Sequence, residues 1–353
     1  MQVHGIALGG PLRVLHVIDA LEGGGAQRVL DQLVRWLTGQ GVEVGIVGAA
    51  GGGFVPPPGV RVWRTDGRPT TVRVIAAAAE MRADVVHAHQ RREALAALVA
   101  GKALRVPVVE HAHSVLPGRA GDRISFQSRR VYAVSPAVAD MVTSRFGRPA
   151  AAVRIVRNIP AVPFVDRARP RRDDGPLRVL GIGRLSAQKD PMRFVAVIAH
   201  LSRARSVQAV WLGRGPLLDP AHQLARTLGA PVSFPGHTDG MEDEIDRSDA
   251  LLMTSRWEGE PLAALEALAR DVPVFSTAAC NAPRLDGADE AVFPDESSAA
   301  EIAGGMMQAF DAPERMSFRT RELRGRLRLE RTPDKVFSPI LEDYLALRGA
   351  VKR

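Results

Sequence analysis

The stretch R-W-E-G-E-P-L-A-A-L-E-A-L-A, residues 256–269, decides how the chain is interpreted. Its first glutamate, Glu258, precedes a predicted helix that opens at Pro261, a residue that suits the first helical position. Glu258 is therefore expected beside the unpaired N–H groups and the positive dipole end of that helix. Glu266 follows eight positions after Glu258 and about 40° round the helix from Leu262, on the edge of the apolar face. We expect its carboxylate to be half-buried and to need hydroxyl or cationic partners.

Two carboxylates beside free N–H groups suit a ligand that carries both phosphate and many hydroxyl groups, such as a nucleotide sugar. The alternative is that Glu258 caps the helix and Glu266 is a solvated surface residue. The flanking residues favour the ligand, because the segment resembles the E-x7-E signature of retaining glycosyltransferases of family four, which have the GT-B fold. The resemblance implies that Glu266 holds the ribose. It also implies that the sugar is held by the loop Glu258, Gly259, Glu260, Pro261 and Leu262. Glu260 stands where that family often has an apolar residue or glycine, which bears on which sugar is held.

The second strong motif is G-I-G-R-L-S-A-Q-K-D, residues 181–190. A predicted strand ends here, a loop carries Arg184 and Lys189, and Asp190 caps the next helix. The two cations are placed to bind a diphosphate, or they are ordinary surface cations. The run is similar to the family's G-R-L-x-x-x-K-G element, which implies that Gly183, Arg184 and Lys189 bind the donor diphosphate. Asp190 replaces the usual glycine.

A third motif, E-G-G-G-A-Q-R at residues 22–28, lies between the first predicted strand and the first predicted helix. We reject a dinucleotide-binding site, because Arg28 stands where a third glycine is needed and no convincing acidic residue ends the next strand. A plain tight turn remains an alternative. The run resembles the family's first glycine-rich loop, which implies that Gly24 and Gly25 face the donor phosphates. Gly213 stands in a run similar to the family's nucleotide-side glycine turn, which implies that it also binds the donor.

Histidines end two adjacent predicted strands, as V-H-A-H at residues 86–89 and E-H-A-H at residues 110–113. Four histidines suggest a metal, yet Glu110 is the carboxylate near them in sequence, and we predict no metal site. For the first pair we favour polar residues that close a strand end. By resemblance, His113 matches the histidine that follows the fourth strand in the family, near the anomeric carbon and the leaving phosphate.

Strands alternate with helices in two halves, which predicts two doubly wound parallel sheets in an α/β fold. The predicted strands are 13–18, 42–48, 84–88, 106–110, 131–134, 177–183, 207–212, 232–235, 250–254 and 272–275. The predicted helices are 26–38, 191–201, 219–228, one that opens at Pro261 and one from about 333. By resemblance the whole is a GT-B fold, in which two Rossmann-like domains face a central cleft. We expect an acceptor-side domain over 1–160, a linker over 161–176, a nucleotide-sugar-binding domain over 177–332 and a terminal helix over 333–353 that crosses back to the first domain.

Composition narrows the classes of function. The chain has 353 residues, 46% of them hydrophobic, and we expect no membrane span and no secretory signal. A single cysteine, Cys280, fits a reducing cytosol.

Charge is unevenly distributed along the chain. Residues 1–165 carry 20 Lys+Arg against 11 Asp+Glu, and the remaining residues carry 27 against 28. This imbalance favours an anionic partner for the first half: a membrane surface, a phosphorylated acceptor or the diphosphate itself. A generally arginine-rich surface explains it equally. Aromatic residues make up only 5% of the chain, so we expect no nucleic-acid partner.

The cysteine content and the expected lack of a signal favour a cytoplasmic protein, and the basic first half favours peripheral contact at the inner face of an anionic membrane. The resemblance implies that it is an enzyme. It would move a sugar from a nucleoside diphosphate sugar to a hydroxyl of a glycan, lipid or small molecule, with retention and with no cofactor or metal. The residues that would act in catalysis are His113, Arg184, Lys189 and Glu258. Two alternatives stay open: a nucleotide-sugar epimerase of the same fold, and an inactive sugar-nucleotide-binding subunit.

Overall fold

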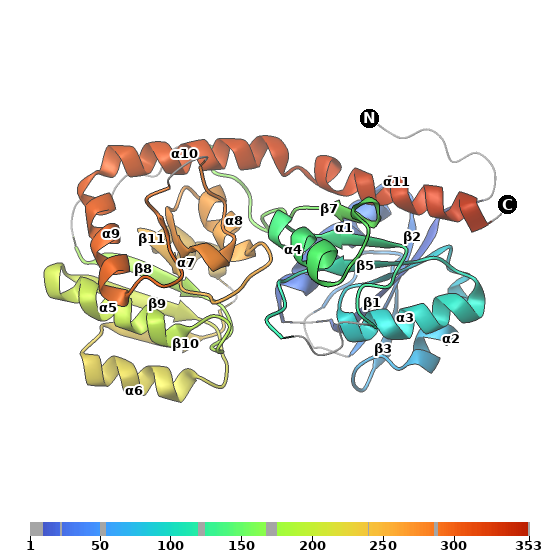
Figure 1. Ribbon diagram of the computed structural model, residues 1–353, viewed down its shortest axis with the longest axis horizontal. Helices are drawn as coiled ribbons and strands as arrows, with labels where there is room; N and C mark the ends of the chain where they lie inside the picture. Colours follow the sequence, from blue (N-terminus) through green and yellow to red (C-terminus); the bar gives the residue numbers. More distant parts are fainter. Residues whose placement is uncertain are drawn as a thin grey trace. The chain divides into compact units, whose positions relative to one another are not determined.

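The computed structural model describes residues 10–21, 23–49, 54–118, 124–166, 175–238, 240–285 and 289–351. The chain divides into two compact units (Figure 1). The first unit comprises Met1–Ile159 and Arg331–Arg353, and the second comprises Pro160–Glu330. Residues 167–174, the middle of the expected linker, lie outside the described residues.

The first unit is built on a seven-stranded parallel sheet of order β3-β2-β1-β4-β5-β6-β7. Its strands are β1 (Arg13–Ala20), β2 (Glu43–Ala49), β3 (Arg61–Thr65), β4 (Val85–Ala88), β5 (Val108–Ala112), β6 (Arg130–Ala133) and β7 (Val153–Ile155). Its helices are α1 (Gly25–Gly39), α2 (Thr71–Met81), α3 (Arg91–Leu104), α4 (Pro136–Asp140), η2 (Met141–Arg145), η3 (Ala150–Ala152) and α11 (Pro333–Val351).

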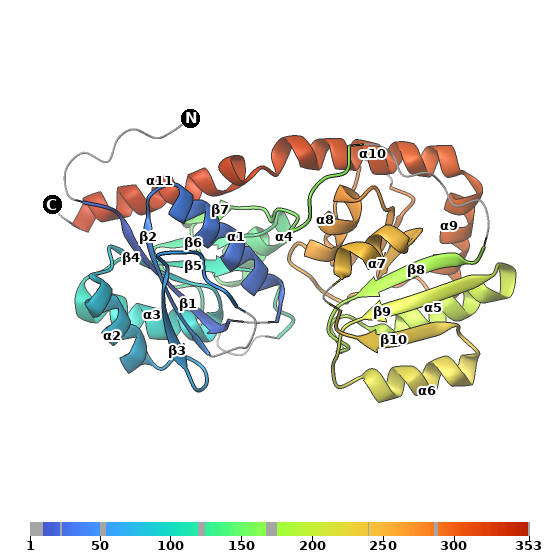
Figure 2. The ribbon, with the colours of Figure 1, turned by 180° about the vertical axis from the view of Figure 1, so that it is seen from behind.

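Helices cover both faces of this sheet. One buried cluster joins Val14 and Ile18 of β1 to apolar residues of α1 and α11, and another joins Leu15 and Val17 to residues of α2 and α3. The alternation along β1 therefore turns even-numbered side chains, His16 among them, toward the face that α1 and α11 cover. Helix α11 lies along the rest of the first unit, as Figures 1 and 2 show. Tyr344 of that helix is completely buried in the first of these clusters.

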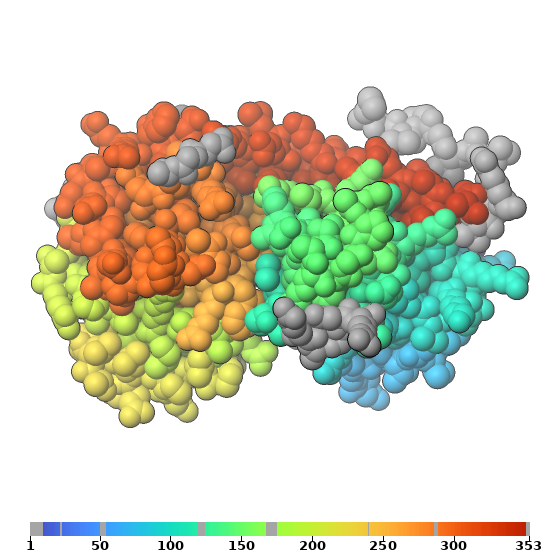
Figure 3. Space-filling view, in the orientation of Figure 1, coloured from blue at the N-terminus to red at the C-terminus, as the bar shows by residue number. Residues whose placement is uncertain are grey.

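The second unit is built on a six-stranded parallel sheet of order β10-β9-β8-β11-β12-β13. Figure 2 shows β8, β9 and β10 side by side, and Figure 3 shows α6 (yellow) at the surface of the unit. Its strands are β8 (Leu177–Ile182), β9 (Val207–Leu212), β10 (Val232–Gly236), β11 (Ala250–Met253), β12 (Val274–Thr277) and β13 (Val292–Phe293). Its helices are α5 (Pro191–Ala204), α6 (Leu218–Leu228), α7 (Met241–Arg247), α8 (Leu262–Ala269), η4 (Ala278–Cys280), α9 (Ala299–Asp311) and α10 (Pro313–Glu330).

Both sheets reverse their strand order next to their first strand. In the first unit β2 and β4 flank β1, and in the second β9 and β11 flank β8. Open parallel sheets bind ligands outside the carboxyl ends of their strands at such a switch point. The fold therefore directs attention to the loops after β1 and β4 in one unit, and after β8 and β11 in the other.

The predicted pair of parallel sheets is confirmed, and each predicted strand overlaps an observed one. The elements absent from our prediction include β3, β7 and β13 and the helices α2, α3, α7, α9 and α10. Within the described residues, none of the helices combines the length and apolar character that a membrane crossing requires.

Candidate active site

An ion pair lies at the switch point of the second sheet. The ammonium Nζ of Lys189, in the loop after β8, is 2.5 Å from Oε1 of Glu258, which follows β11. The Glu258 carboxylate also accepts a hydrogen bond of 2.8 Å from the Ser255 hydroxyl, and only 9% of its side chain is exposed. Two predicted site residues that stand 69 positions apart are thus in direct contact.

The loop after β8 explains why glycine is usual where this chain has Asp190. The backbone of Asp190 is left-handed, with φ 48°, a conformation that favours glycine and that aspartate tolerates better than most residues. Its carboxylate accepts a hydrogen bond from the backbone N–H of Arg193 and so caps α5, and it pairs with Arg256 at 2.9 Å. The predicted cap is confirmed.

Glycines let two loops of this edge lie against each other. Gly183 and Gly213 have φ of +145° and +138°, where a side chain is strained. A Cβ at Gly213 would lie 2.1 Å from the carbonyl oxygen of Gly183, so only glycine fits there. The fold itself therefore requires glycine at Gly183 and Gly213, because the loops after β8 and β9 approach each other closely.

Arg184 differs from Lys189 in its surroundings. It lies exposed in the same loop, and it forms no hydrogen bond or ion pair with any residue that the structure describes. A guanidinium that no protein carboxylate holds is available to an anion at this edge.

Two expectations for α8 are wrong in detail. Pro261 is the N-cap of the helix, which begins at Leu262, one residue later than predicted. Glu266 is 1% exposed, where we expected a half-buried side chain. The reason is that almost the whole circumference of α8 is buried, not one apolar face. With Glu258 and Glu260 also buried, the surface alternative for these acids no longer holds.

The Glu258 loop is held in place by residues that the sequence patterns did not predict. The side-chain amide of Asn281 donates a hydrogen bond of 2.8 Å to the carbonyl oxygen of Glu258, and the backbone N–H of Glu258 donates one to the carbonyl of Ala279. Asn281 is left-handed, with φ 51°. The run A-A-C-N-A-P, residues 278–283, therefore supports the Glu258 loop, a role that only the tertiary contact reveals.

The remaining predicted residues belong to the first unit. Gly24 is the N-cap of α1 and Gly25 its first residue, so the N-cap has no side chain that could cap the helix, and its first turn contains no acidic residue. His113 follows β5 and is half-buried. Burial lowers the pKa of His113 to about 3, so the imidazole is neutral at pH 7.

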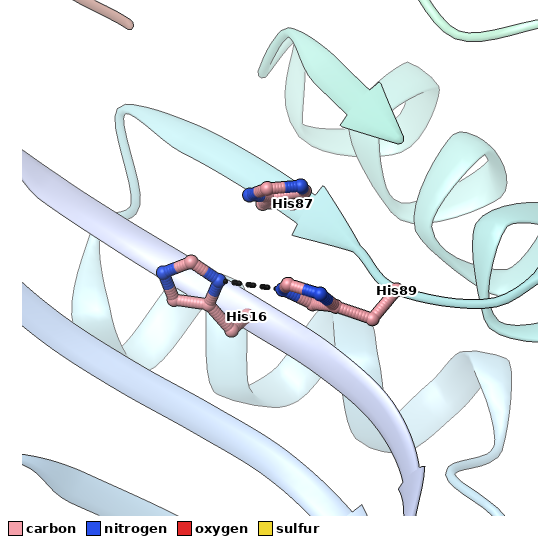
Figure 4. A group of neighbouring side chains, drawn as sticks. All are labelled: His16, His87 and His89. Atoms are coloured by element: carbon pink, nitrogen blue, oxygen red, sulfur yellow. Dashed lines mark hydrogen bonds between the residues drawn. The ribbon is translucent and has the colours of Figure 1, made fainter. Parts of the chain in front are cut away.

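His113 ends a chain of imidazoles that the sequence patterns only half revealed. Its Nε2 lies 3.2 Å from Nδ1 of His89, whose Nε2 lies 3.0 Å from Nδ1 of His16 on β1 (Figure 4). His87 stacks on His89, with ring centroids 4.4 Å apart, and on His111. His16 was missed because it stands alone in an apolar strand, and its partners are more than 70 residues away.

A cavity of about 440 Å³ lies in the first unit, but at the other edge of the sheet. Its lining includes Arg13 and Asp84, which stand at the amino ends of β1 and β4. Arg82 and Arg105 of the same cavity are the C-caps of α2 and α3, where a cation is favoured by the helix dipole. We do not count this cavity as part of the active site.

Comparisons with known proteins agree with this architecture. Residues 23–159 match the model of Glycosyltransferase Family 4, and residues 164–322 match that of Glycosyl transferases group 1. Over 299 residues the chain is 30% identical to a glycogen synthase of Mycobacterium tuberculosis. The aligned region covers 76% of this chain and 70% of that protein. Over 105 residues, 29% of each chain, it is 30% identical to an undecaprenol-linked glycan α-1,4-N-acetyl-D-galactosaminyltransferase of Campylobacter jejuni.

Solved structures show the same fold. A glycosyltransferase from Rickettsia africae superposes with a TM-score of 0.77 at 14% identity, over 96% of this chain and 99% of that one. HepE of Anabaena, solved with UDP and glucose, superposes with a TM-score of 0.79 at 17% identity, over 95% and 100%.

Two Rossmann-like sheets, with the motif residues of the second at its switch point, define the GT-B fold. The family models and the 30% identical relative make the chain a glycosyltransferase, the class of enzyme that takes its sugar from a nucleotide sugar. The chain belongs to family four of the glycosyltransferases. The resemblance stated from the sequence is confirmed.

Proposed function

We propose that this glycosyltransferase moves a hexosyl group from a nucleoside diphosphate sugar to an acceptor hydroxyl, with retention at the anomeric carbon and without a metal ion at the diphosphate. The observation that carries the proposal is the contact between Lys189 and Glu258 at the switch point of the second sheet. It sets a cation for phosphate directly beside a buried carboxylate that accepts hydrogen bonds from sugar hydroxyls.

The donor roles follow from the environment of each side chain. Lys189 neutralises Glu258 in the free protein and bridges it to a phosphate oxygen when donor binds. Arg184, exposed and without a partner among the described residues, adds the second cation. Together they stabilise the charge that develops on the leaving diphosphate, as a metal ion does in other transferases. Buried Glu266 accepts hydrogen bonds from the ribose hydroxyls.

The transfer step needs little from the protein besides these groups. The acceptor oxygen forms its bond to the anomeric carbon on the face from which the diphosphate leaves, and the leaving phosphate oxygen takes the acceptor's proton. His113 acts as a neutral hydrogen-bonding group at the anomeric end, which its lowered pKa supports. Gly24 and Gly25 carry no side chains, so the phosphates can approach the N-terminus of α1 closely, where the helix dipole favours an anion.

Two observations bear on the acceptor. The relatives are named for glycogen and for an undecaprenol-linked glycan, which supports a glycan acceptor, free or lipid-linked. The first unit carries 25 Lys+Arg against 14 Asp+Glu, and the second 22 against 25. This supports an acceptor that is anionic or presented at an anionic membrane surface, and with it a cytoplasmic, peripheral place of action.

A thermal-shift panel of nucleoside diphosphates and their sugars tests the donor class, because a ligand that binds the folded protein raises its melting temperature. We expect a subset of nucleotide sugars to raise it, and the matching diphosphate to do so less. The proposal is wrong if no nucleotide sugar binds while the folded protein binds a different class of ligand.

Donor incubated alone and then with acceptor glycans separates this function from its alternatives. With donor alone, an epimerase converts the donor to its epimer, whereas a transferase gives at most slow hydrolysis. When acceptor glycans are added, a transferase consumes the donor and an inactive subunit leaves it unchanged. Proton spectra of the anomeric region distinguish the three outcomes.

A further inference from the structure

A group of histidines in the first unit is buried far more deeply than polar strand ends require. His16, His87 and His89 are 0%, 0% and 1% exposed, and one ring nitrogen of each lies within 4.8 Å of those of the other two (Figure 4). They come from two neighbouring strands, β1 and β4, whose register sets His16 directly opposite His87. The same face of the sheet is covered by α1 and α11.

The protein leaves part of this group without hydrogen bonds. Nε2 of His16 and Nε2 of His87 have no hydrogen-bond partner among the residues that the structure describes. A buried polar atom without a partner costs about 1–3 kcal/mol, and leucine or phenylalanine would fill the same space without that cost. Nε2 of His87 is the clearest case, because Tyr344 holds the other nitrogen of that ring and leaves Nε2 available to a ligand within the buried cluster.

We propose that these three histidines form a metal site for a borderline divalent transition ion of the zinc kind, with His16 Nδ1, His87 Nε2 and His89 Nε2 as ligands. Two ligands of a tetrahedral zinc ion lie about 3.3 Å apart, given Zn–N bonds of 2.0–2.1 Å. The His16 and His89 nitrogens are already 3.0 Å apart. His87 has to move toward them by at most about 1.5 Å, the difference between the 4.8 Å limit and that spacing.

The outer nitrogens of two ligands already have the partners that metal-binding histidines use. Nδ1 of His87 lies 2.5 Å from the hydroxyl of Tyr344, and Nδ1 of His89 lies 3.2 Å from Nε2 of His113. A metal-bound imidazole donates its other N–H to such a partner, which fixes the ring orientation. Zinc on His89 would therefore make Nε2 of His113 a hydrogen-bond acceptor and leave its proton on Nδ1.

The donor set selects the ion. Three neutral imidazoles suit zinc, copper, nickel or cobalt, whereas magnesium, calcium and manganese prefer carboxylate and carbonyl oxygens. Three protein ligands also leave one open position for water or a small anion. We therefore expect Zn²⁺ and Co²⁺ to bind and Mg²⁺ not to.

A second group, His89, His111 and His113, also brings its ring nitrogens within 4.8 Å, and it shares His89. We favour the first group because Nδ1 of His87 and Nδ1 of His89 already have hydrogen-bond partners that orient these rings as ligands. Neither ring nitrogen of His111 has a hydrogen-bond partner among the described residues, so only ring stacking holds that side chain.

The experiment measures Zn²⁺ binding by calorimetry to the full chain without a histidine tag, together with the visible absorption of the Co²⁺-loaded protein. We expect one ion per chain and the intense bands of tetrahedral cobalt. His16→Gln should weaken Zn²⁺ binding at least tenfold. Tyr344→Phe keeps the ring packing but removes the hydroxyl that orients His87, and should weaken binding about tenfold.

His200→Gln, a half-buried histidine of α5 in the second unit, is the matched control and should leave Zn²⁺ affinity unchanged. If His16→Gln does not fold, Tyr344→Phe and the cobalt spectrum of the natural chain decide. No Zn²⁺ binding, or equal affinity in all variants, overturns the site. Binding that survives His16→Gln but is lost in His113→Gln assigns the ion to the second group instead. The proposal does not depend on the transfer function, so its failure leaves that function standing.

Discussion

The two units share one architecture but differ in the chemistry of their switch points. In the second unit charged groups meet at the edge, with Lys189 against Glu258 and Asp190 against Arg256. In the first unit the same edge carries neutral imidazoles, which bond to one another and to Tyr344. The fold fixes where a site is built, and the side chains at the strand ends decide which kind of ligand it serves.

The net charges of the units run the other way. The first unit carries an excess of 11 positive charges, from 25 Lys+Arg and 14 Asp+Glu, although its buried edge is neutral. The second unit has an excess of 3 negative charges, from 22 and 25, yet it presents two cations in the loop after β8. The net charge of a unit and the charge of the groups at its switch point are therefore separate properties, which can be tested separately.

Acid should unfold the first unit before the second. The pKa of His16 is lowered by burial to about 3, below its ordinary value of 6.5, so the unfolded chain binds its proton first and stability is lost as pH falls below about 6.5. Between pH 8 and pH 5 this residue alone removes about 2 kcal/mol. His113 behaves alike, and the pKa values of His87, His89 and His111 are also lowered by burial.

Glu110 opposes this trend. Burial raises its pKa to about 7, so protonation in acid relieves a buried charge and returns about 2.5 kcal/mol over the same range. His16 and His113 together outweigh it by about 1.5 kcal/mol, and the lowered pKa values of the other three histidines act in the same direction, so we expect a net loss in the free energy of unfolding. Urea titrations at both pH values measure the loss, and hydrogen exchange should show that the first unit opens first. Equal protection of both units at pH 5 would contradict the comparison.

Lys189→Ala should weaken nucleotide-sugar binding by about 1–3 kcal/mol, roughly five- to 150-fold. The change removes a phosphate partner and leaves the Glu258 carboxylate without its cation. Calorimetry with the donor identified by the panel gives the affinity. Arg247→Ala removes an exposed cation paired with Glu244 on α7 and should change nothing measurable. Unchanged affinity in folded Lys189→Ala would remove the residue from the site.

Glu258→Gln and Glu266→Gln should separate the two ends of the donor. If Glu266 holds the ribose, its change weakens the diphosphate and the nucleotide sugar alike, by about 1–3 kcal/mol. If Glu258 holds the sugar, its change weakens the nucleotide sugar and leaves the diphosphate nearly unaffected. The ratio of the two affinities is the readout, and the opposite pattern exchanges the roles.

Apolar patterns predicted the sheets because parallel strands are buried on both faces and are therefore hydrophobic runs. Helix α10 escaped for the opposite reason, since its buried side includes arginine. Arg319 is 5% exposed and pairs with Asp289 at 2.6 Å, and Arg324 pairs with Asp271 at 2.8 Å. An inward arginine looks like a surface residue in the sequence until its aspartate is known.

The site was predictable to the extent that its residues stand in local motifs. Lys189 and Glu258 each lie in such a motif, although the contact between them is a tertiary fact. His16 and Asn281 stand in no motif, and each acts through a partner on another element. Sequence spacing carries no information about such pairs.

The positive excess of the first unit should give a smaller effect. Attraction to anionic vesicles amounts to about 1 kcal/mol for each basic residue near the surface, and it weakens as the Debye length falls from about 10 Å at 0.1 M salt to about 3 Å at 1 M. We expect sedimentation with anionic but not neutral vesicles, reversed by salt. If neither vesicle binds and a small neutral acceptor is glycosylated efficiently, the acceptor is neither anionic nor membrane-bound.

The smallest effect should come from chelation. Because Arg184 and Lys189 take the place of a cation at the diphosphate in our proposal, turnover after dialysis against EDTA should stay within about twofold, or 0.4 kcal/mol of the activation barrier. If turnover is lost, adding back Mg²⁺ or Zn²⁺ separately shows whether the metal binds at the donor site of the second unit or at the histidines of the first. Mg²⁺ binds phosphate oxygens and not imidazoles. Recovery of lost turnover with Mg²⁺ would therefore place a metal at the donor diphosphate and contradict the proposal that Arg184 and Lys189 replace it. Recovery with Zn²⁺ alone would instead locate the ion at the histidines of the first unit. The proposal that Arg184 and Lys189 bind the diphosphate without a metal in the second unit would then stand.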